Sequence, residues 1–337
     1  MRQELASYLT RVRGTVTNPH GVVVVSGVTQ GITLLCRVLL EQGHRRIAVE
    51  DPSNAVQRRL LARLGLEVVD VPVDGQGLQV DALAATQARA VLCTPAHQYP
   101  TGVVLSPSRR RQLLQWAEDF NGLILEDDFD AEFRYERLPV ACLQAMNPDR
   151  VVLLGSVSKT LAPALRLGWM ITPPALIASM RSAKRDDDFG SNGLDQHVFA
   201  SLLHSGQYDR HVRGLRRLYR ARRDFFVQAL AARLPEWTVT GSAGGLNLTI
   251  SLPGHIPEGA MVAAANELGL LVVGLGTMTG RAEHPACIVV SFARATADMA
   301  KDAVERLVTA ITTLDTITPE LVGRAKVMGD TAWLDTR

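Results

Sequence analysis

Short apolar runs recur along the first half of the chain and alternate with segments of helical periodicity. Strands are expected at 47–50, 67–71, 90–93, 123–126, 151–154 and 168–171, with helical segments such as 54–64 and 107–120 between them. Apolar strands joined through helices are typical of a mainly parallel sheet that is covered on both faces. The pattern therefore predicts an α/β fold for this part of the protein.

The pattern changes after Pro173 and Pro174. Helical segments continue to about residue 234, and strands at 238–240, 246–250, 270–273 and 288–291 precede a helix near 298–313. This second pattern predicts a smaller α+β lobe. The expected organisation is a large domain at 1–175, a helical connection with the small C-terminal lobe at 176–314, and a tail at 315–337.

Lys159 lies in the segment GSVSKTLAPALRLGWM, residues 155–170, directly after an apolar strand. The expected strand thereby places a lone amine in a turn of small residues that is rich in hydroxyl groups. We expect apolar walls around this amine and the cation of Arg166 nearby, a setting suited to a Schiff-base nucleophile. Taken alone, the segment is also compatible with an ordinary junction between a strand and a loop.

Two other strands are followed by polar segments. Residues 126–130 read EDDFD after an apolar run, which places carboxylates at the strand end where open α/β sheets bind their ligands. The segment TPAHQYPTG at 94–102 predicts an irregular loop at another strand end. A solvated or metal-binding acidic loop is the alternative, but the cysteines and histidines show no metal-ligand spacing, so we expect no metal.

The valine run at 22–25 turns through Gly27 into an amphipathic helical segment at 32–40. Free N–H groups at the start of that helix, together with neighbouring Ser and Thr hydroxyls, form an anion site suited to a phosphate. A single glycine turn of this kind is weak evidence for a phosphate site on its own, and its interpretation depends on the other segments.

In this chain order, the phrases HQYPTG, LEDDFDAEFRY and GSVSKTLAPALRLGWM resemble the fold-type-I enzymes that use pyridoxal 5′-phosphate (PLP). The likeness runs from about residue 5 to about residue 308 and is particularly close to the aminotransferase-like domain of MocR/GabR-type regulators of the GntR family. The resemblance implies a PLP-dependent transferase fold of type I, a homodimer, and an amino acid or amine as the small-molecule partner.

The resemblance also implies roles for individual residues. Lys159 forms the Schiff base with the cofactor, and Asp127 pairs with the pyridine nitrogen, which makes the cofactor an electron sink. The phosphate is surrounded by Gly27, Val28, Thr29, Ser156, Ser158 and Arg166. The remaining expected cofactor contacts are Asn54, His97, Tyr99 and Phe129.

Several positions depart from the family pattern. Phe129 stands where relatives usually carry a tyrosine that donates to the cofactor's phenolic oxygen. Tyr99 replaces an asparagine that supports the same oxygen, as is usual in the regulator-like branch, and His97 or Gln98 is expected to compensate. Asn54 stands where an aromatic side chain usually stacks on the ring, a contact worth about 1 kcal/mol beyond area burial.

The arginine that binds the substrate carboxylate in archetypal aminotransferases falls at Val289. Arg281 and Arg294 are the candidates to replace it. Residues 5–14 resemble a helix well inside the relatives' domain, and the arm, linker and winged helix that would precede it have no counterpart here. The expectation is a truncated gene product, a mis-assigned start or a stripped descendant.

Composition agrees with a soluble cytoplasmic protein. The 36 basic and 34 acidic side chains give a net charge of +2, which makes no case for nucleic-acid binding by this chain. The arginines of 213–223 fit a solvated helix or a subunit interface. The four cysteines are scattered, as suits reduced thiols, and no apolar stretch approaches the ~20 residues of a membrane helix.

Two functions remain open at this point. The first is a PLP-dependent aminotransferase that moves an amino group between an amino acid and a 2-oxo acid. The second is an effector-sensing domain of a MocR/GabR-type regulator, in which the same site binds cofactor and amine with slow turnover or none. Phe129, Asn54 and Val289 favour sensing, whereas the lack of a DNA-binding segment removes the output that a sensor needs.

Overall fold

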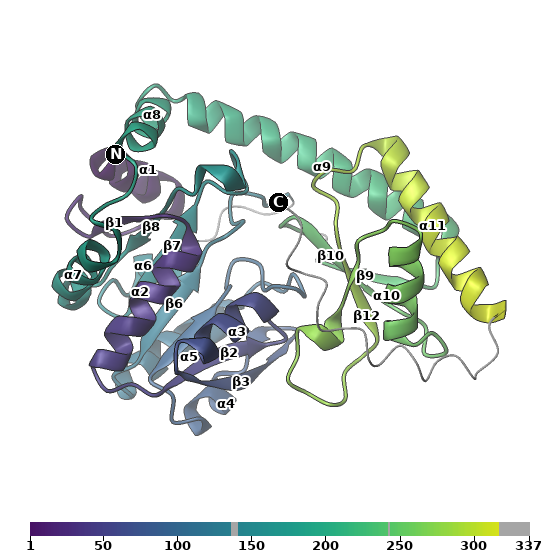
Figure 1. Cartoon of the computed structure of the whole chain (residues 1–337), viewed down its shortest axis with the longest axis horizontal. Helices are drawn as coiled ribbons and strands as arrows, with labels where there is room; N and C mark the ends of the chain where they lie inside the picture. Colours follow the sequence, from purple (N-terminus) through teal and green to yellow (C-terminus); the bar gives the residue numbers. More distant parts are fainter. Residues whose placement is uncertain (136–140, 242, 317–337) are drawn as a thin grey trace. The chain divides into compact units, whose positions relative to one another are not determined.

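The computed structural model describes residues 1–135, 141–241 and 243–316 (Figure 1). The chain forms two compact units that divide within helix α9 (Gln207–Arg233). The first holds Met1–Arg217 and Ala243–Gly245, and the second holds Leu218–Ser242 and the described chain from Leu246 onward. The division falls later than the boundary expected after residue 175, because the helices that follow that point pack on the first unit.

Within the described residues of the first unit, eight strands form one sheet in the order β1-β8-β7-β6-β5-β2-β3-β4. The strands are β1 Val22–Val25, β2 Arg46–Asp51, β3 Glu67–Asp74, β4 Gly77–Leu78, β5 Ala90–Cys93, β6 Leu123–Asp127, β7 Val151–Ser156 and β8 Gly168–Ile171. The pairs β3–β2, β2–β5, β5–β6 and β6–β7 are parallel, and β8 runs antiparallel between β7 and β1. The mainly parallel α/β sheet expected from the sequence is confirmed.

Helices cover both faces of this sheet because the strand residues are apolar on both sides. In β6, Leu125 packs with α2 (Val28–Glu41) and α7 (Ile177–Asp188), whereas Ile124 packs with α5 (Pro107–Asp119) on the opposite face. Burying each such side chain contributes about 1.5–3 kcal/mol. The other helices of this unit are α1 Arg2–Arg13, α3 Ala55–Arg63, α4 Val80–Ala85, α6 Leu143–Met146 and α8 Gly193–His204.

A third apolar cluster joins α1, α8 and the start of α9 to the β7–β8–β1 edge of the sheet. Phe199 of α8 stacks on Trp169 of β8 with ring centroids 6.0 Å apart, and Tyr208 of α9 meets Phe199 edge to face at 5.0 Å. These aromatic contacts keep α8 on the first unit. Figure 1 shows α1 and α8 side by side.

The second unit contains an antiparallel sheet in the order β11-β12-β10-β9 within the described residues. Its elements are β9 Thr238–Thr240, β10 Asn247–Ser251, α10 Glu258–Glu267, β11 Val273–Gly274, β12 Cys287–Ser291 and α11 Ala297–Thr316. The expected strand at 270–273 is largely absent among these residues, since only Val273 and Gly274 pair with β12 and Leu271 is exposed. The expected tail at 315–337 lies mostly outside the described residues.

None of the helices in the described ranges combines the length and the apolar character that crossing a lipid bilayer requires.

A buried ion pair ties α1 to the acidic segment after β6. Arg13 Nε and Nη2 donate to the two carboxylate oxygens of Asp128 at 2.8 and 2.6 Å. Both side chains are less than a tenth exposed. A bidentate pair of this kind fixes geometry, and removing one partner leaves a buried charge behind.

We therefore predict that Arg13→Ala lowers the free energy of unfolding by about 3–5 kcal/mol. Arg11→Ala is the matched control, because Arg11 lies on the same helix and forms an exposed pair with Asp209 at 2.7 Å. That variant should lose at most about 1 kcal/mol. Urea unfolding followed by circular dichroism measures both, and equal losses would show that burial of the Arg13 pair has no special role.

Candidate functional site

The carboxyl ends of the parallel strands meet at one edge of the sheet and gather the expected site residues. Asp51, Asp127 and Ser156 are the last residues of β2, β6 and β7. Gly168 of β8 lies opposite both Ser156 and Val25, so the turn after β1 reaches the same edge. The sheet register thus brings together the segments LEDDFDAEFRY and GSVSKTLAPALRLGWM and the glycine turn after β1.

Lys159 follows β7 in a turn held by hydroxyl groups. The Ser158 N–H donates to Ser156 Oγ at 3.4 Å, and the buried hydroxyls of Thr160 and Tyr208 lie 2.8 Å apart. The Lys159 side chain is exposed in the described chain, so the expectation of apolar walls around it is wrong. Small and hydroxyl-bearing residues form this turn, and they leave the amine accessible from solvent.

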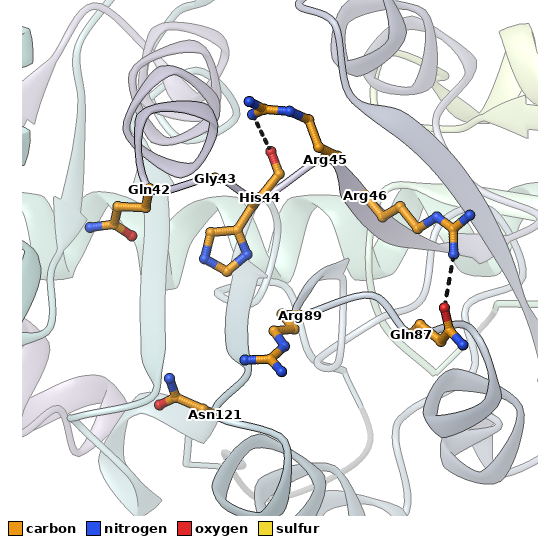
Figure 2. Close-up of a pocket in the computed structure, with 8 residues that line it drawn as sticks. All are labelled: Gln42, Gly43, His44, Arg45, Arg46, Gln87, Arg89 and Asn121. Carbon is orange, nitrogen blue, oxygen red and sulfur yellow. Dashed lines mark hydrogen bonds between the residues drawn. The ribbon is translucent and has the colours of Figure 1, made fainter.

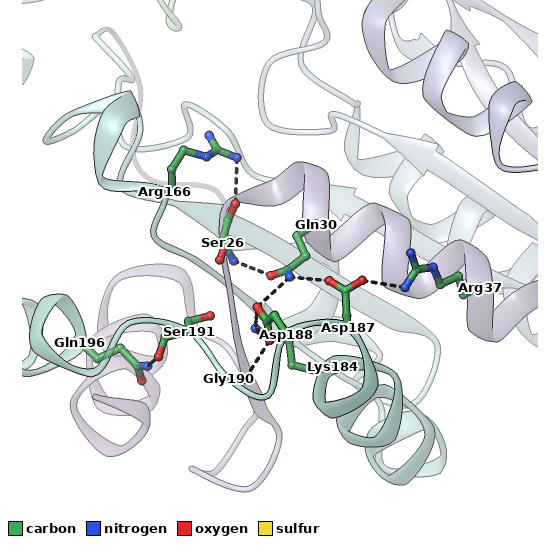
Figure 3. A network of polar contacts seen from close by, with 10 residues as sticks. All are labelled: Ser26, Gln30, Arg37, Arg166, Lys184, Asp187, Asp188, Gly190, Ser191 and Gln196. Carbon is green, nitrogen blue, oxygen red and sulfur yellow. Dashed lines mark hydrogen bonds and ion pairs between the residues drawn. The ribbon is translucent and has the colours of Figure 1, made fainter.

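The turn between β1 and α2 has the features of an anion site. Gly27 is the N-cap of α2 with φ of 89°, and no side chain caps that helix start within the described residues. Arg166 Nη2 donates to the Ser26 carbonyl at 2.8 Å, and a Cβ added to Gly27 would lie 2.6 Å from that nitrogen (Figure 3). The N–H groups at the start of α2, which include those of Val28 and Thr29, and a guanidinium therefore converge at one turn.

Gln30 fixes this turn from the α7 side (Figure 3). Its Oε1 accepts the Ser26 N–H at 2.7 Å, and its Nε2 donates to Asp187 at 2.7 Å and to Asp188 at 2.9 Å. Arg37 pairs with Asp187 at 2.7 Å on the outer side of the network. Both polar groups of the Ser26 backbone are thereby satisfied, which holds the peptide that leads into Gly27.

Asp127 is a buried carboxylate with one satisfied oxygen. Gln57 Nε2 donates to Asp127 Oδ2 at 2.7 Å, whereas Asp127 Oδ1 is buried without a hydrogen-bond partner among the described residues. Burial raises the pKa of Asp127 to about 7, although the Gln57 bond and the charge of Lys159 act to lower it. An unpaired buried oxygen of this kind is suited to accept a hydrogen bond from a protonated ring nitrogen.

The loop after β5 is fixed mainly by its own side chains. His97 Nδ1 lies 3.1 Å from Asp130 Oδ1, and both residues are buried. The Gln98 amide nitrogen donates to the Pro52 carbonyl at 2.7 Å, and its oxygen accepts from Thr101 Oγ1 at 2.6 Å. These bonds engage His97 Nδ1 and the Gln98 amide, whereas His97 Nε2 is buried without a hydrogen-bond partner among the described residues. Replacement of the missing tyrosine hydroxyl by His97 or Gln98 stays a prediction.

Two of the departures from the family pattern have clear structural roles. Phe129 meets Tyr99 edge to face, with ring centroids 6.0 Å apart and planes at 88°. Asn54 is the N-cap of α3, and its Oδ1 accepts the N–H groups of Val56 at 2.9 Å and Gln57 at 3.3 Å. The side chain that stands in the place of the stacking aromatic therefore organises the helix that carries Gln57.

The candidate carboxylate-binding residues belong to the second unit. Val289 is buried in β12, where it pairs with Thr249 of β10. Arg294 is exposed and lines a cavity of about 320 Å³ within that unit, together with Phe226. Arg281 lies in an exposed segment before β12. Substrate binding by Arg281 or Arg294 stays a prediction.

Sequence reasoning missed Gln30, Gln57 and the pairing of Asp130. Gln57 had a local signal, because Asn54-x-x-Gln57 matches a capping box at the start of a predicted helix. The structure shows that Gln57 does not close that box on the Asn54 backbone but reaches Asp127 on a neighbouring strand. No local pattern predicts the contacts of Gln30 with Asp187 and Asp188, because these two partners are more than 150 residues away in the sequence.

A polar pocket of about 640 Å³ lies at the opposite, amino-terminal edge of the sheet (Figure 2). His44, Arg45, Arg46 and Arg89 line it. Arg45 caps the Leu40 carbonyl near the end of α2, and α4 and α5 also end beside this pocket. Cations at helix C-termini complement the helix dipoles, which accounts for the charge of this pocket without a ligand.

The residues at the carboxyl edge fit pyridoxal 5′-phosphate. The anion turn at Gly27 and Arg166 suits its phosphate, the Lys159 amine suits its aldehyde, and the buried Asp127 Oδ1 suits its ring nitrogen. In each of these three cases, the fit is judged from the hydrogen-bonding groups and the charge that the protein residues present.

Comparison with known proteins agrees with this assignment. The family model for class I and II aminotransferases matches residues 1–311. The pyridoxine biosynthesis regulator PdxR of Corynebacterium glutamicum is 36% identical over 282 residues, which cover 83% of this chain and 60% of the regulator. Aromatic-amino-acid aminotransferase 1 of Thermococcus litoralis is 29% identical over 81% of this chain and 68% of its own length.

Among solved structures, the kynurenine aminotransferase of Pyrococcus horikoshii superposes with a TM-score of 0.84 and 26% identity. The superposition covers 94% of this chain and 80% of that enzyme. The fold is therefore PLP-dependent transferase fold type I, and relatives include both regulators and aminotransferases. The chain belongs to the class I and II aminotransferase family.

Proposed function

We propose that this chain is a PLP-dependent aminotransferase domain that moves an amino group between an amino acid and a 2-oxo acid. The observation that carries the proposal is the meeting of an accessible Lys159 amine, a buried Asp127 oxygen and the anion turn at Gly27 on one sheet edge. The chain spans 60% of the length of PdxR, so the activity of a longer relative is not transferred to it directly.

The cofactor, when bound, supplies an aldehyde for amine exchange and an electron sink for the bond that breaks at the substrate's α-carbon. Lys159 Nζ is the amine that would hold the aldehyde group, and the same amine would accept a proton from the substrate's α-carbon and return it as general acid. Asp127 keeps a proton on the ring nitrogen through Oδ1. Arg166 and the α2 N–H groups would hold the phosphate and neutralise its charge.

Effector sensing is the second candidate, favoured by the 36% identity to PdxR and by Phe129 and Asn54. A sensor needs the same cofactor and the same amine, but it does not need fast proton transfer. The missing hydroxyl at Phe129 affects the cofactor's phenolic oxygen, and it therefore affects turnover more than binding. The two candidates differ in what happens after an amine binds.

A homodimer is part of this proposal. Three large apolar side chains in the α7–α8 region are exposed in the single chain: Phe189 at 92%, Leu194 at 71% and Val198 at 53%. Exposed apolar side chains that cluster in one region are typical of an interaction surface. A second copy of the chain is the partner that family membership supports.

The proposed activity predicts that the cofactor-loaded protein shows a visible absorption band that Lys159→Ala abolishes. A panel of amino acids should convert the wild-type cofactor to its amine form, with release of a 2-oxo acid that mass spectrometry detects. Binding of amines without this conversion would favour the sensor. Failure of borohydride reduction to label Lys159 would contradict both candidates.

The phosphate turn predicts a role for Gln30 in cofactor affinity. Gln30→Ala removes one hydrogen bond to the Ser26 N–H, so the dissociation constant for PLP should rise roughly three- to tenfold. Arg37→Ala is the control, because it breaks the exposed pair with Asp187 without touching Ser26. Fluorescence titration measures both constants, and an equal rise in the two variants would argue against a specific role for Gln30.

The raised pKa of Asp127 predicts that the free energy of unfolding of the cofactor-free protein falls as the pH rises. Its folded-state pKa of about 7 lies above the ordinary 3.8, so the stability that the neutral carboxyl provides is lost as pH rises from about 4 to 7. Asp127→Asn removes this loss. The stability of the variant relative to wild type should therefore grow by about 3 kcal/mol between pH 5 and pH 8.

Urea unfolding of the two cofactor-free proteins at a series of pH values measures this difference. Asp187→Asn is the control, because hydrogen bonds from Gln30 and Arg37 lower the pKa of exposed Asp187. Its contribution is lost only toward acid pH, so its difference from wild type should stay constant over the same interval. A constant difference for Asp127→Asn as well would mean that burial does not shift this carboxyl.

A further inference from the structure

We propose that Tyr208 and His211 of α9 are positioning residues that hold the turn after β7 through Thr160 and thereby place the Lys159 amine for its bond to the cofactor. The inference rests on the proposed function, because it assumes that Lys159 bonds covalently to pyridoxal 5′-phosphate. It gives the start of α9 a role that the sequence motifs do not predict.

The start of α9 presents two polar side chains to the Lys159 turn. Tyr208 and His211 are three positions apart in the sequence, so they lie on one face of the helix. Tyr208 Oη lies 2.8 Å from Thr160 Oγ1, and His211 Nε2 lies 2.6 Å from the Thr160 carbonyl oxygen. One residue of the turn is therefore held twice from the same helix, by its side chain and by its main chain.

The chemistry of the acceptors determines the direction of both hydrogen bonds. A carbonyl oxygen only accepts, so the His211 ring donates through Nε2. Thr160 Oγ1 directs its single hydrogen to the Val157 carbonyl at 3.3 Å, so Tyr208 is the donor to Thr160 Oγ1. Burial raises the pKa of Tyr208 well above its ordinary value. The phenol therefore keeps the proton that this bond requires.

The aromatic cluster of the first unit fixes the Tyr208 ring. The side chain is buried, and its ring meets Tyr8 at 5.3 Å and Phe199 at 5.0 Å between centroids, both edge to face. Packing against two rings leaves a buried side chain little freedom to change its position. Because the Tyr208 hydroxyl stays at one point, its bond to Thr160 restrains the turn.

Lys159 depends on the main chain of this turn for its position. Its side chain is exposed in the described chain, whereas the next residue, Thr160, is buried. The Val157 carbonyl accepts the N–H groups of Thr160 at 3.2 Å and Leu161 at 2.7 Å, which closes the turn around Lys159. Fixing Thr160 therefore limits the positions that Lys159 Nζ can reach. A covalent bond requires the amine at one point, so this restraint favours bond formation.

Two forms of the cofactor separate the positioning of Lys159 from general stability of the site. Pyridoxal 5′-phosphate carries the aldehyde that bonds to Lys159, whereas pyridoxamine 5′-phosphate has the same ring and phosphate but an amine in place of the aldehyde. Tyr208→Phe keeps the ring and removes the donor. Its affinity for the aldehyde form should fall roughly three- to tenfold, as for one hydrogen bond, and its affinity for the amine form should not change.

His211→Leu should have the same selective effect on the aldehyde form. His211 is exposed, so this variant tests the proposal even if the buried change at Tyr208 disturbs folding. His211→Gln keeps an N–H donor at the end of the side chain and should restore the affinity for the aldehyde form. Fluorescence titration of the cofactor-free proteins measures all of these dissociation constants.

Tyr8→Phe is the matched control, because Tyr8 is a buried tyrosine of the same aromatic cluster. Its hydroxyl forms no hydrogen bond to the Lys159 turn within the described chain, so both affinities should stay unchanged. In a Lys159→Ala background, the effect of Tyr208→Phe on the aldehyde form should disappear, because no covalent bond remains to be favoured.

Hydrogen exchange of the cofactor-free proteins gives a second readout. The Thr160 and Leu161 amides should exchange roughly three- to tenfold faster in Tyr208→Phe and His211→Leu than in the wild-type protein, because the turn opens more often. The Tyr8→Phe control should exchange at the wild-type rate. Mass spectrometry of the peptides that contain these amides measures the rates.

Equal losses of affinity for the two cofactor forms would overturn the proposal, because Tyr208 and His211 would then stabilise the site without placing Lys159. Unchanged affinity for the aldehyde form in the folded variants, or unchanged exchange at Thr160 and Leu161, would also overturn it. Failure of the wild-type protein to bind either form would instead contradict the proposed function. The exchange rates would still show whether α9 holds the turn, so the two failures are distinguishable.

Discussion

The burial of the Asp127 carboxyl group is the constraint around which the site is arranged. Burial raises its pKa to about 7, and a buried charge is costly unless it is bonded or paired. Among the described residues the compensation is partial, through one hydrogen bond from Gln57 and the charge of Lys159. A buried carboxyl group with incomplete compensation is typical of a functional site. A cationic ligand that bound to it would offset the desolvation cost that remains after folding.

Two neighbouring carboxylates of the acidic segment have side-chain partners of their own in fixed positions. The cluster of Asp127, Asp128 and Asp130 is separated into distinct pairs, since Asp128 binds Arg13 and Asp130 binds His97. Asp127 Oδ1, in contrast, is buried without a hydrogen-bond partner among the described residues. The acidic segment is therefore neither a solvated loop nor a uniform negative patch, because each carboxylate has its own direction and its own partner.

The amino-acid sequence was sufficient to predict which site residues follow the ends of strands. Lys159, Asp127 and Gly27 each follow an apolar run, and the meeting of parallel strands at one edge brings them together. Contacts between side chains on different elements could not be predicted in this way, as Gln30 and Gln57 show. The exposure of Lys159 was also missed, because local composition does not reveal which residues from distant segments cover a turn.

The substitutions at Phe129 and Asn54 act on different parts of the cofactor, and they need not have the same consequence. Under the proposed function, Phe129 lacks the hydroxyl that would donate to the cofactor's phenolic oxygen. The change at Asn54 concerns the ring, and the cap it provides supports Gln57 and so the ring-nitrogen end. The described residues thus keep a buried carboxyl group suited to the ring nitrogen, whereas position 129 supplies no hydroxyl group. Under the proposed function, such a site would still bind amines, and its rate of turnover would depend on how well Lys159 moves the proton without help from residue 129.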